Sequence, residues 1–495
     1  MDPTVRCDAT HDAYTMSLEK IDVSDPKLYQ DDVWHPYFER LRREDPVHWC
    51  QDGVYGSYWS VTKYRDIMSV ETNHRTYSSD ATLGGISITD RPMEYRRPSF
   101  ISMDPPKHDE QRKTVAPIVA PMNLNKLAGT IRERAARVLD ALPRNETFDW
   151  VSNVSIELTI QMLTTLLDFP FEDRHKLVYW SDCAIADVNA GGIVDSEARR
   201  LEILTEALDC FTQIWHERAA AEPRPDLISM LAHSEATRDL YLRPQELLGN
   251  LTLLIVGGNE TTRNSISGGV WALNNNPGEY RKLRENPGLI PSLVPEIIRW
   301  QTPVMHMRRT AIADGEIAGK RLRKGDKVVM WYLSGNRDEE AIERANEFII
   351  DRARPRQHLS FGFGIHRCVG NRLAEMQLAI LWEEILKRFP MIEVMDEPQR
   401  VYANFIRAPG AHPRLSAAHL TIRCKASPPP SRAVSDSRRR LSLHPPDRLV
   451  GASCQACRSA KARLRAEAEP REYRRVLGEE DRQCCRARKT NSSPG

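Results

Sequence analysis

Residues 361–370 read FGFGIHRCVG, and this stretch decides how the whole chain is interpreted. Cys368 comes directly before residues 369–389, where apolar side chains recur at helical spacing. The free N–H groups and the positive dipole end at the start of a helix lower the pKa of a thiol. The sequence therefore predicts that Cys368 is a thiolate at a helix N-terminus, although a buried and inert cysteine would fit the same position.

The neighbours of Cys368 suit a flat ligand that is bound through its sulfur. Phe361 can pack beside the sulfur and exclude water, and three glycines allow tight turns and a close approach of the backbone: Gly362, Gly364 and Gly370. The spacing F-x-x-G-x-H-x-C-x-G resembles the haem-binding loop of the cytochrome P-450 superfamily. The resemblance implies haem b with Cys368 as its axial thiolate ligand, which favours O–O cleavage. It also implies that Phe361, Gly364 and Gly370 belong to the cofactor site.

A second motif, GGNETT at residues 257–262, lies inside a long helical pattern over residues 244–276. Two glycines within a helix cost roughly 1 kcal/mol each relative to alanine, so we expect the helix to bend there or to bring a group close to its backbone. An ordinary packing kink is the alternative. Glu260 and Thr261 are predicted to deliver protons to bound O2, as an acid and an alcohol. The motif resembles the superfamily's small-Gly-x-acid-Thr pattern, which favours this interpretation.

Other charged residues fit roles that the resemblance implies. Glu296 and Arg299 are three apart on a predicted helix and share a face, and in the superfamily such a pair is buried and structural. Arginine can bind a haem propionate bidentately, and histidine can donate one hydrogen bond. The candidates stand at the four places where the superfamily has propionate ligands: His108, Arg112, Arg309 and His358. Each of them alone could equally be a surface residue.

The resemblance extends over residues 30–407, and the order of its motifs is typical of a soluble bacterial cytochrome P-450. Strings such as LLIVGGNETTRNSISGGVWALNNNP and HLSFGFGIHRCVGNRLAEMQL look like the bacterial alkane terminal-hydroxylase family. This implies a monooxygenase that hydroxylates an aliphatic C–H bond, namely the terminal methyl of a medium-chain alkane or fatty acid, with O2 as co-substrate. It also implies a ferredoxin and a ferredoxin reductase as partners, with NAD(P)H as the indirect electron source.

Several alternatives to this function stay open. The substrate could be a sterol side chain or a methyl-branched lipid, the oxidant could be peroxide, or the chain could be a haem-binding sensor or relic without turnover. Four residues stand beside motif residues that are expected to face the haem, and they predict an apolar substrate pocket unless they are simply core: Val256, Gly257, Val304 and Met305.

Composition indicates the compartment and the class of partner. The formal net charge is +2, which argues against nucleic acid as a partner, and no window approaches the ~18 apolar residues of a membrane span. The polar N-terminus shows no signal-peptide core, so we expect a cytoplasmic protein without stable membrane insertion. The ten cysteines are then expected to be thiols or ligands and not disulfides.

The expected elements are mainly helical. Besides the two helical patterns above, residues 289–300 form an amphipathic helix. Residues 316–332 fit a hairpin with its turn at residues 324–325, and residues 392–406 fit a second pair of short strands. The expected fold is the triangular, mainly α haem-thiolate fold of the superfamily, with small β-sheets.

A break in charge divides the chain after residue 407. Residues 408–495 carry 19 Lys and Arg against 8 Asp and Glu, whereas residues 1–407 carry 51 against 60. Residues 408–495 also have few large apolar side chains and no periodicity, so they are predicted to be a disordered Arg-, Pro- and Cys-rich tail, for which a translational frame change is one explanation. A zinc site at its cysteines and nucleic-acid or lipid binding by its arginines are alternatives. The haem domain is predicted to span residues 1–407.

Overall fold

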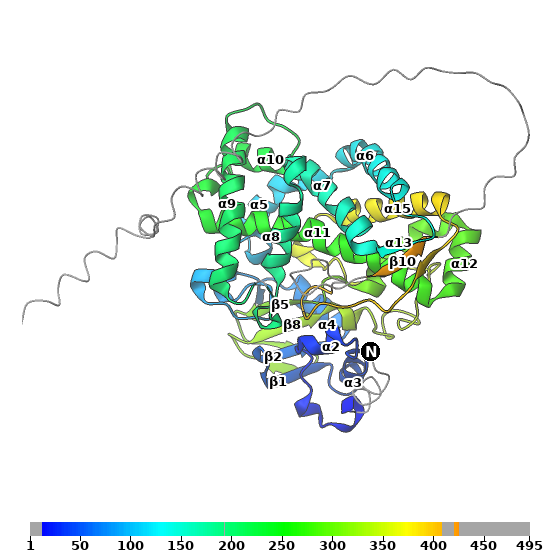
Figure 1. Cartoon of the computed structure of the whole chain (residues 1–495). Coiled ribbons are helices and arrows are strands. Elements are labelled where there is room, and N and C mark those ends of the chain that lie inside the picture. The colour runs from blue at the N-terminus through cyan, green and yellow to red at the C-terminus, as the bar shows by residue number, and fades with distance from the viewer. Residues whose placement is uncertain (1–11, 193, 408–419, 425–495) are drawn as a thin grey trace, which may run out of the picture. The chain divides into compact units, whose positions relative to one another are not determined.

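The computed structural model describes residues 12–192, 194–407 and 420–424, and the chain divides into two units, residues 1–432 and 433–495. Every described residue belongs to the first unit, so the predicted tail lies outside the described residues except at 420–424. Helices dominate this unit, which confirms the mainly α prediction (Figure 1). The described α-helices are α2 (Pro26–Gln30), α3 (His35–Glu44), α4 (Tyr64–Thr72), α5 (Lys107–Val115), α6 (Pro121–Asp140), α7 (Glu157–Leu167), α8 (His175–Ile185), α9 (Glu197–Ala219), α10 (Leu227–His233), α11 (Pro244–Asn275), α12 (Pro277–Glu285), α13 (Ile290–Gln301), α14 (Tyr332–Gly335) and α15 (Asn371–Arg388).

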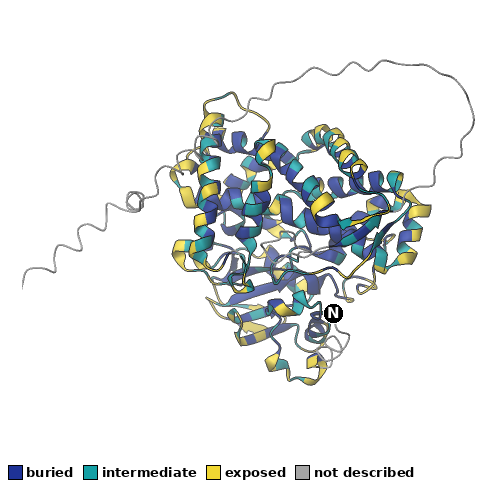
Figure 2. Ribbon diagram, viewed as in Figure 1, coloured by how far each residue is buried: buried dark blue, intermediate teal, exposed yellow. Residues whose placement is uncertain are grey.

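Helix α11 runs through the middle of this unit and contacts α7, α8, α13 and α15 (Figure 1). Its first residue is Pro244, whose missing N–H is not needed at that position, and Pro277 begins the next helix after a one-residue break. Much of this helix is buried (Figure 2), above all residues 262–270, whereas residues 252–258 are mostly not buried. The predicted helices at 244–276, 289–300 and 369–389 are therefore confirmed. None of the described helices, α11 included, combines the length and apolar content that a membrane span requires.

The strands within the described residues form three small sheets. The largest has the order β1-β2-β8-β5-β3, the second has the order β4-β10-β9, and β6 pairs with β7. Their bounds are β1 (Val47–Gly53), β2 (Gly56–Val61), β3 (Tyr77–Ser78), β4 (Thr147–Asp149), β5 (His306–Ala311), β6 (Gly315–Ile317), β7 (Lys320–Leu322), β8 (Lys327–Trp331), β9 (Ile392–Val394) and β10 (Thr421–Cys424).

The predicted hairpin at residues 316–332 is wrong in its turn. The chain reverses at Ala318 and Gly319, both with positive φ, so that β6 pairs with β7. Strand β8 instead pairs in parallel with β2 and antiparallel with β5, and every residue of it is buried. The predicted strand pair within 392–406 does not form either, because β9 pairs with β10 and Ile406 bridges to Val304.

Strand β10 lies in the segment that was assigned to the tail. It pairs antiparallel with both β4 and β9, and Leu420, Ile422 and Cys424 are buried in the main hydrophobic core. The domain boundary predicted after residue 407 is therefore too early, since the folded unit includes residues up to at least 424. A strand with only two buried positions, Ile422 and Cys424, gives too short an alternation to stand out within a polar segment.

Candidate active site

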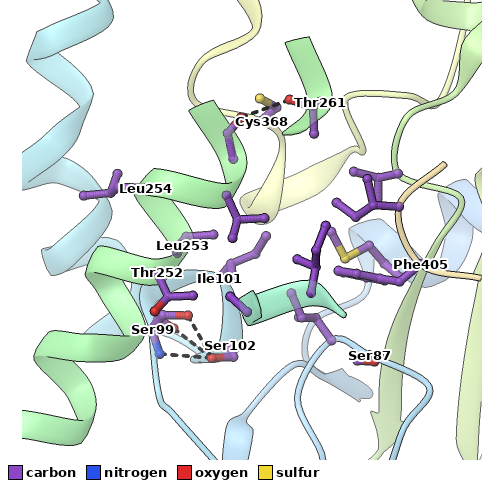
Figure 3. Close-up of a pocket in the computed structure, with 18 of the residues that line it drawn as sticks. Ser87, Ser99, Ile101, Ser102, Thr252, Leu253, Leu254, Thr261, Cys368 and Phe405 are labelled. Atoms are coloured by element: carbon purple, nitrogen blue, oxygen red, sulfur yellow. Dashed lines mark hydrogen bonds between the residues drawn. The ribbon is translucent and has the colours of Figure 1, made fainter. Parts of the chain in front are cut away.

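A cavity of about 460 Å³ is lined by residues of α11 and of the segment that leads into α15. This volume is in the usual range for sites that bind small molecules. Figure 3 shows Cys368 and Thr261 at one end of the cavity, and Ser99 and Ser102 at the other. The lining between these ends is mostly apolar, with Ile101, Leu253, Val304, Met307 and Phe405 among its side chains.

The loop before α15 turns twice to bring Cys368 to the cavity. Gly362 and Gly364 have φ values of 63° and 65°, in the left-handed region that favours glycine. A Cβ atom on Gly364 would also collide with the backbone carbonyl of Glu71. The Cys368 N–H donates to the Phe361 carbonyl at 2.8 Å, which closes the loop. Cys368 is accessible from the cavity, which its side chain lines, although the sulfur lies within the protein.

The surroundings of the Cys368 sulfur combine burial with positive charge. Burial raises the pKa of the thiol, and this effect is opposed by the N–H groups of Gly370 and Asn371 and by the guanidinium groups of Arg112 and Arg367. These donors suit an anionic sulfur, and a thiol that coordinates a metal ion is deprotonated. The donor set therefore fits a thiolate ligand that faces the cavity at the start of α15.

Basic side chains gather beside this end of the cavity. Arg112, Arg309 and His366 line it, and the His108 ring lies 4.5 Å from the His366 ring. Arg309 is paired with Glu71 at 3.1 Å. Within the described residues, His108 Nε2 and His366 Nδ1 are buried without a hydrogen-bond partner.

Burial, and next the nearby charge of Arg309, lower the pKa of His366 to about 2. A cluster of cations and unpartnered ring nitrogens beside the cavity fits the two propionates of a haem. The donors for both haem carboxylates and the axial ligand are thus present.

His358 lies on another side of the Cys368 loop. It is buried, its ring lies 5.5 Å from the Phe361 ring, and it lines a second pocket together with Arg112 and Cys368. Burial, followed by the charge of Arg299, lowers its pKa to about 3. Of the four predicted propionate ligands, Arg112 and Arg309 line the main cavity, His108 lies beside it against His366, and His358 lines the second pocket, so their shared role stays a prediction. His366 is a further candidate, and its signal was present in the sequence because it is the fixed histidine of the F-x-x-G-x-H-x-C-x-G spacing.

The two adjacent glycines of α11 have different surroundings. A Cβ atom on Gly258 would lie 2.7 Å from Leu163 Cδ2 on α7, so this glycine permits close helix packing. A Cβ atom on Gly257 would meet nothing within 4 Å, and Gly257 is exposed to the cavity. Thr261 also lines the cavity, and its hydroxyl donates to the Gly257 carbonyl at 2.9 Å. Gly258 thus serves helix packing, whereas Gly257 leaves room for a group to approach the backbone, and that approach stays a prediction.

Glu260 faces away from Thr261. It is fully buried and accepts hydrogen bonds from Ser181 Oγ at 2.8 Å, from Asn259 Nδ2 at 3.0 Å and from Arg263. Burial raises its pKa to about 8, and the charge of Arg263 opposes this shift. Arg263 in turn contacts Asp182 at 3.0 Å. Successive residues of a helix point about 100° apart. Glu260 of the predicted acid–alcohol pair therefore points toward α8, whereas Thr261 lines the cavity.

Glu296 and Arg299 form the centre of a buried ion-pair network. Both side chains are 0% exposed, and two hydrogen bonds of 2.7 Å join them. Arg352 adds a third partner at 3.1 Å from Glu296, and Arg299 also donates to the carbonyls of Asn336 and Ala345. None of these contacts involves the cavity. Their geometry agrees with the structural role expected for this pair.

Three of the four predicted substrate residues line the cavity, namely Val256, Gly257 and Val304. Met305 does not, because it is fully buried in a separate core cluster with Trp331. Part of the remaining lining comes from residues 81–102 and 403–406. These segments have no regular periodicity, so sequence patterns gave no signal for them.

Comparisons with known proteins agree with this site. A family model described as Cytochrome P450 matches residues 288–409. Linalool 8-monooxygenase of Pseudomonas putida is 36% identical over 403 residues, which cover 79% of this chain and 97% of that protein. Cytochrome P450-153 from Novosphingobium aromaticivorans aligns with a TM-score of 0.75 and 43% identity, and CYP153D17 from Sphingomonas sp. PAMC 26605 with 0.75 and 45%. Each of these two alignments covers 82% of this chain and 99% of the solved structure.

The relatives therefore confirm the resemblance that residues 361–370 indicate, and the mainly helical architecture is the P450 fold. Relatives named as monooxygenases also identify the class of reaction. The chain belongs to the cytochrome P450 family and is an oxidoreductase of the monooxygenase type.

Proposed function

We propose that this monooxygenase holds haem b through Cys368 and hydroxylates an aliphatic C–H bond, the terminal methyl of a medium-chain alkane or fatty acid. One observation carries the proposal: the Cys368 side chain and the Thr261 hydroxyl line the same end of a cavity whose other walls are mostly apolar. The sequence resemblance to the alkane terminal-hydroxylase family supports the choice of substrate. An apolar cavity favours binding of an alkyl chain because its burial removes apolar surface from water.

The cofactor would be held by the groups described above. The Cys368 sulfur would ligate the iron, Gly364 and Gly370 would let the loop approach the ring closely, and Phe361 would shield the sulfur from water. His108, Arg112, Arg309 and His358 are the predicted partners of the propionates, and His366 would join them. Haem bound in this way supplies the activation of O2.

Two residues of α11 handle protons in this proposal. The Thr261 hydroxyl donates to the Gly257 carbonyl, so its oxygen is held in place at the cavity and can accept a hydrogen bond there. The Glu260 carboxyl, with its pKa raised to about 8, is able to hold a proton near neutral pH. Delivery of that proton requires the Glu260 carboxyl to turn from Arg263 toward the cavity, so Ser181 and Arg263 position the acid.

A ferredoxin delivers the electrons, and a ferredoxin reductase transfers them from NAD(P)H to the ferredoxin in the cytoplasm. A second pocket, on the Cys368 loop and the start of α15, supports this part of the proposal. Four arginines line this pocket, namely Arg112, Arg356, Arg367 and Arg372, whereas Glu375 is its single carboxylate. A basic surface favours association with an acidic partner through complementary charge.

Turnover with surrogate partners tests the proposed function. The purified chain would be combined with a bacterial ferredoxin, its reductase and NADH, and supplied separately with octane, dodecanoic acid and a sterol. We expect terminal alcohols from octane or dodecanoic acid. Oxidation of the sterol alone would contradict the substrate class, and haem-bound protein with no product from any substrate would indicate a relic. Equal rates with hydrogen peroxide in place of NADH and O2 would contradict the electron route.

A further inference from the structure

The end of the cavity near Ser99 contains a group of charged residues that the proposed reaction does not use. The cavity is lined there by four arginines, namely Arg91, Arg96, Arg97 and Arg200. Two acidic residues, Glu197 and Asp187, line it as well. The guanidinium groups therefore exceed the carboxylates by two. Such an excess is unusual inside a cavity that is otherwise mostly apolar, because charged groups seldom leave water without a partner.

Three of these arginines already have partners. Arg91 Nε donates to Glu197 Oε1 at 3.2 Å, and Arg200 donates to the same oxygen. Arg200 Nε also donates to the Cys183 carbonyl at 3.1 Å. Arg96 donates to the carbonyls of Arg91 and Thr82, each at 2.7 Å. Because these contacts occupy the guanidinium groups of Arg91, Arg96 and Arg200, the three side chains have little capacity to bind a further ligand.

Arg97 differs from its neighbours. Its Nη1 atom is buried and has no hydrogen-bond partner within the described residues. Burial, and then the charges of Arg91 and Arg200, lower the pKa of Arg97 to about 10. Glu197, which also pairs with Arg91 and Arg200, is the carboxylate whose charge opposes this shift. A buried guanidinium that shares one carboxylate with two other cations is stabilised by an added anion. The planar group presents paired donors that match a carboxylate.

The place of residue 97 along α11 gives the approximate length of a ligand that could reach the reacting end. A Cβ atom on Gly249 would lie 3.0 Å from the Arg97 carbonyl, so the backbone of residue 97 packs against α11 at that turn. Gly257 is eight residues further along the helix, which corresponds to about 12 Å. Leu253 and Val256 line the cavity between them. With C–C bonds of about 1.5 Å in an extended zigzag, roughly ten carbons span this distance.

We propose that Arg97, supported by the charges of Arg91 and Arg200, binds the carboxylate of a medium-chain fatty acid. The alkyl chain then lies along α11, and its terminal methyl reaches the end of the cavity at Cys368 and Thr261. The inference rests on the proposed hydroxylase function and selects the fatty acid over the alkane within it. It makes Arg97 the residue that determines both head-group specificity and the end of the chain that reacts.

Calorimetric titration of the haem-loaded full chain tests this assignment without turnover. The ligands are decanoate and methyl decanoate, which differ mainly in the charge of the head group. The variants are Arg97→Gln, which removes the charge, Arg97→Lys, which keeps it, and Arg199→Gln as a control. Arg199 is an exposed arginine nearby on α9, so its substitution changes the net charge equally without touching the cavity.

We expect Arg97→Gln to weaken decanoate binding about tenfold or more, because a hydrogen bond to a charged group is lost. Binding of methyl decanoate should change less than about twofold, Arg97→Lys should restore part of the decanoate affinity, and Arg199→Gln should have no effect. Equal weakening of both ligands in Arg97→Gln would overturn the assignment, as would unchanged decanoate binding.

The same titration separates this inference from the proposed function. Terminal hydroxylation of octane with no head-group preference in any variant would overturn the role of Arg97 and leave the hydroxylase proposal standing. Charge-selective decanoate binding that depends on Arg97, in a protein that forms no product with surrogate partners, would support the binding site and contradict the proposed reaction.

Discussion

At the scale of single residues, substitution of Thr261 tests its role at the cavity. We expect Thr261→Ala to keep NAD(P)H consumption but to lower the yield of alcohol per NAD(P)H roughly tenfold or more, with hydrogen peroxide released instead, because the ordered hydroxyl is lost. Thr261→Ser retains the hydroxyl and is the matched control. Product and peroxide would be quantified in the same reactions, and full coupling in Thr261→Ala would refute the role.

Among single residues, those in short motifs were predictable from the sequence. The positions of Cys368 and Thr261 follow from motifs of ten residues or fewer, and both line the cavity. Which of two histidines in one loop faces the cavity depends on the turns at Gly362 and Gly364, and for this reason His366 was missed. The orientation of Glu260 toward Arg263 was equally beyond the motif, since it requires α8 as a neighbour.

The two histidines of the Cys368 loop are expected to differ in haem retention. His366→Ala removes a ring at the propionate cluster and should weaken haem binding about tenfold or more, the value of one hydrogen bond to a charged group. His358→Ala is the comparison, since His358 lines the second pocket with Arg112 and Cys368 but does not line the main cavity. Transfer of haem to apomyoglobin would be timed for both variants. Faster loss from His358→Ala than from His366→Ala would contradict this order and identify His358 as the stronger propionate ligand.

At the scale of elements, long helices were predictable and short strands were not. Helix α11 matches its predicted range to within one residue, because it has clear proline signals and its 32 residues make about nine turns. The hairpin near residues 316–332 was misassigned, because β8 takes its partners from β2 and β5, which are distant in sequence. Strand β10 has four residues, too few for a periodic pattern.

Strand β10 should be required for stability although it lies beyond residue 407. A chain that ends at Arg407 loses the buried side chains of Leu420 and Ile422, and each is worth about 1.5–3 kcal/mol on burial. We therefore expect its free energy of unfolding to fall by at least about 3 kcal/mol. A chain that ends at Arg432 keeps β10 and is the control. Urea unfolding compares the two, and equal midpoints would contradict the place of β10 in the core.

At the scale of the whole molecule, His306 joins three segments that are distant in sequence. Its Nδ1–H donates to the Asn404 carbonyl at 2.9 Å, and its Nε2 accepts from the Ile88 N–H at 3.2 Å. The ring is 0% exposed, and burial lowers its pKa to about 4. This arrangement suits only the neutral ring, because a protonated Nε2 would face another N–H group.

Acidification should therefore destabilise the protein. The unfolded chain binds a proton at His306 near pH 6.5, whereas the folded chain does so only near pH 4. The stability is fully present above pH 6.5 and falls by about 3 kcal/mol from this residue as the pH drops to 4. His35 and His358, whose pKa values burial lowers to about 3, act in the same direction.

Unfolding of the wild type and of His306→Asn in urea, at a series of pH values from about 4.5 to about 7.5, measures this effect. The variant has no titratable ring at position 306, so its stability should depend less steeply on pH in this window, whatever its value at pH 7.5. Identical slopes for the two proteins would disprove the assignment.

The carbon monoxide difference spectrum of the reduced full chain tests the central claim, that the Cys368 thiolate is the axial ligand of a haem. We predict a Soret band shifted strongly to the red, as a thiolate ligand produces. Cys368→His should give the band of a neutral-ligand haem, which shows that the shift depends on this sulfur. A neutral-ligand band in the wild type, or a purified chain that binds no haem, would contradict the assignment of Cys368.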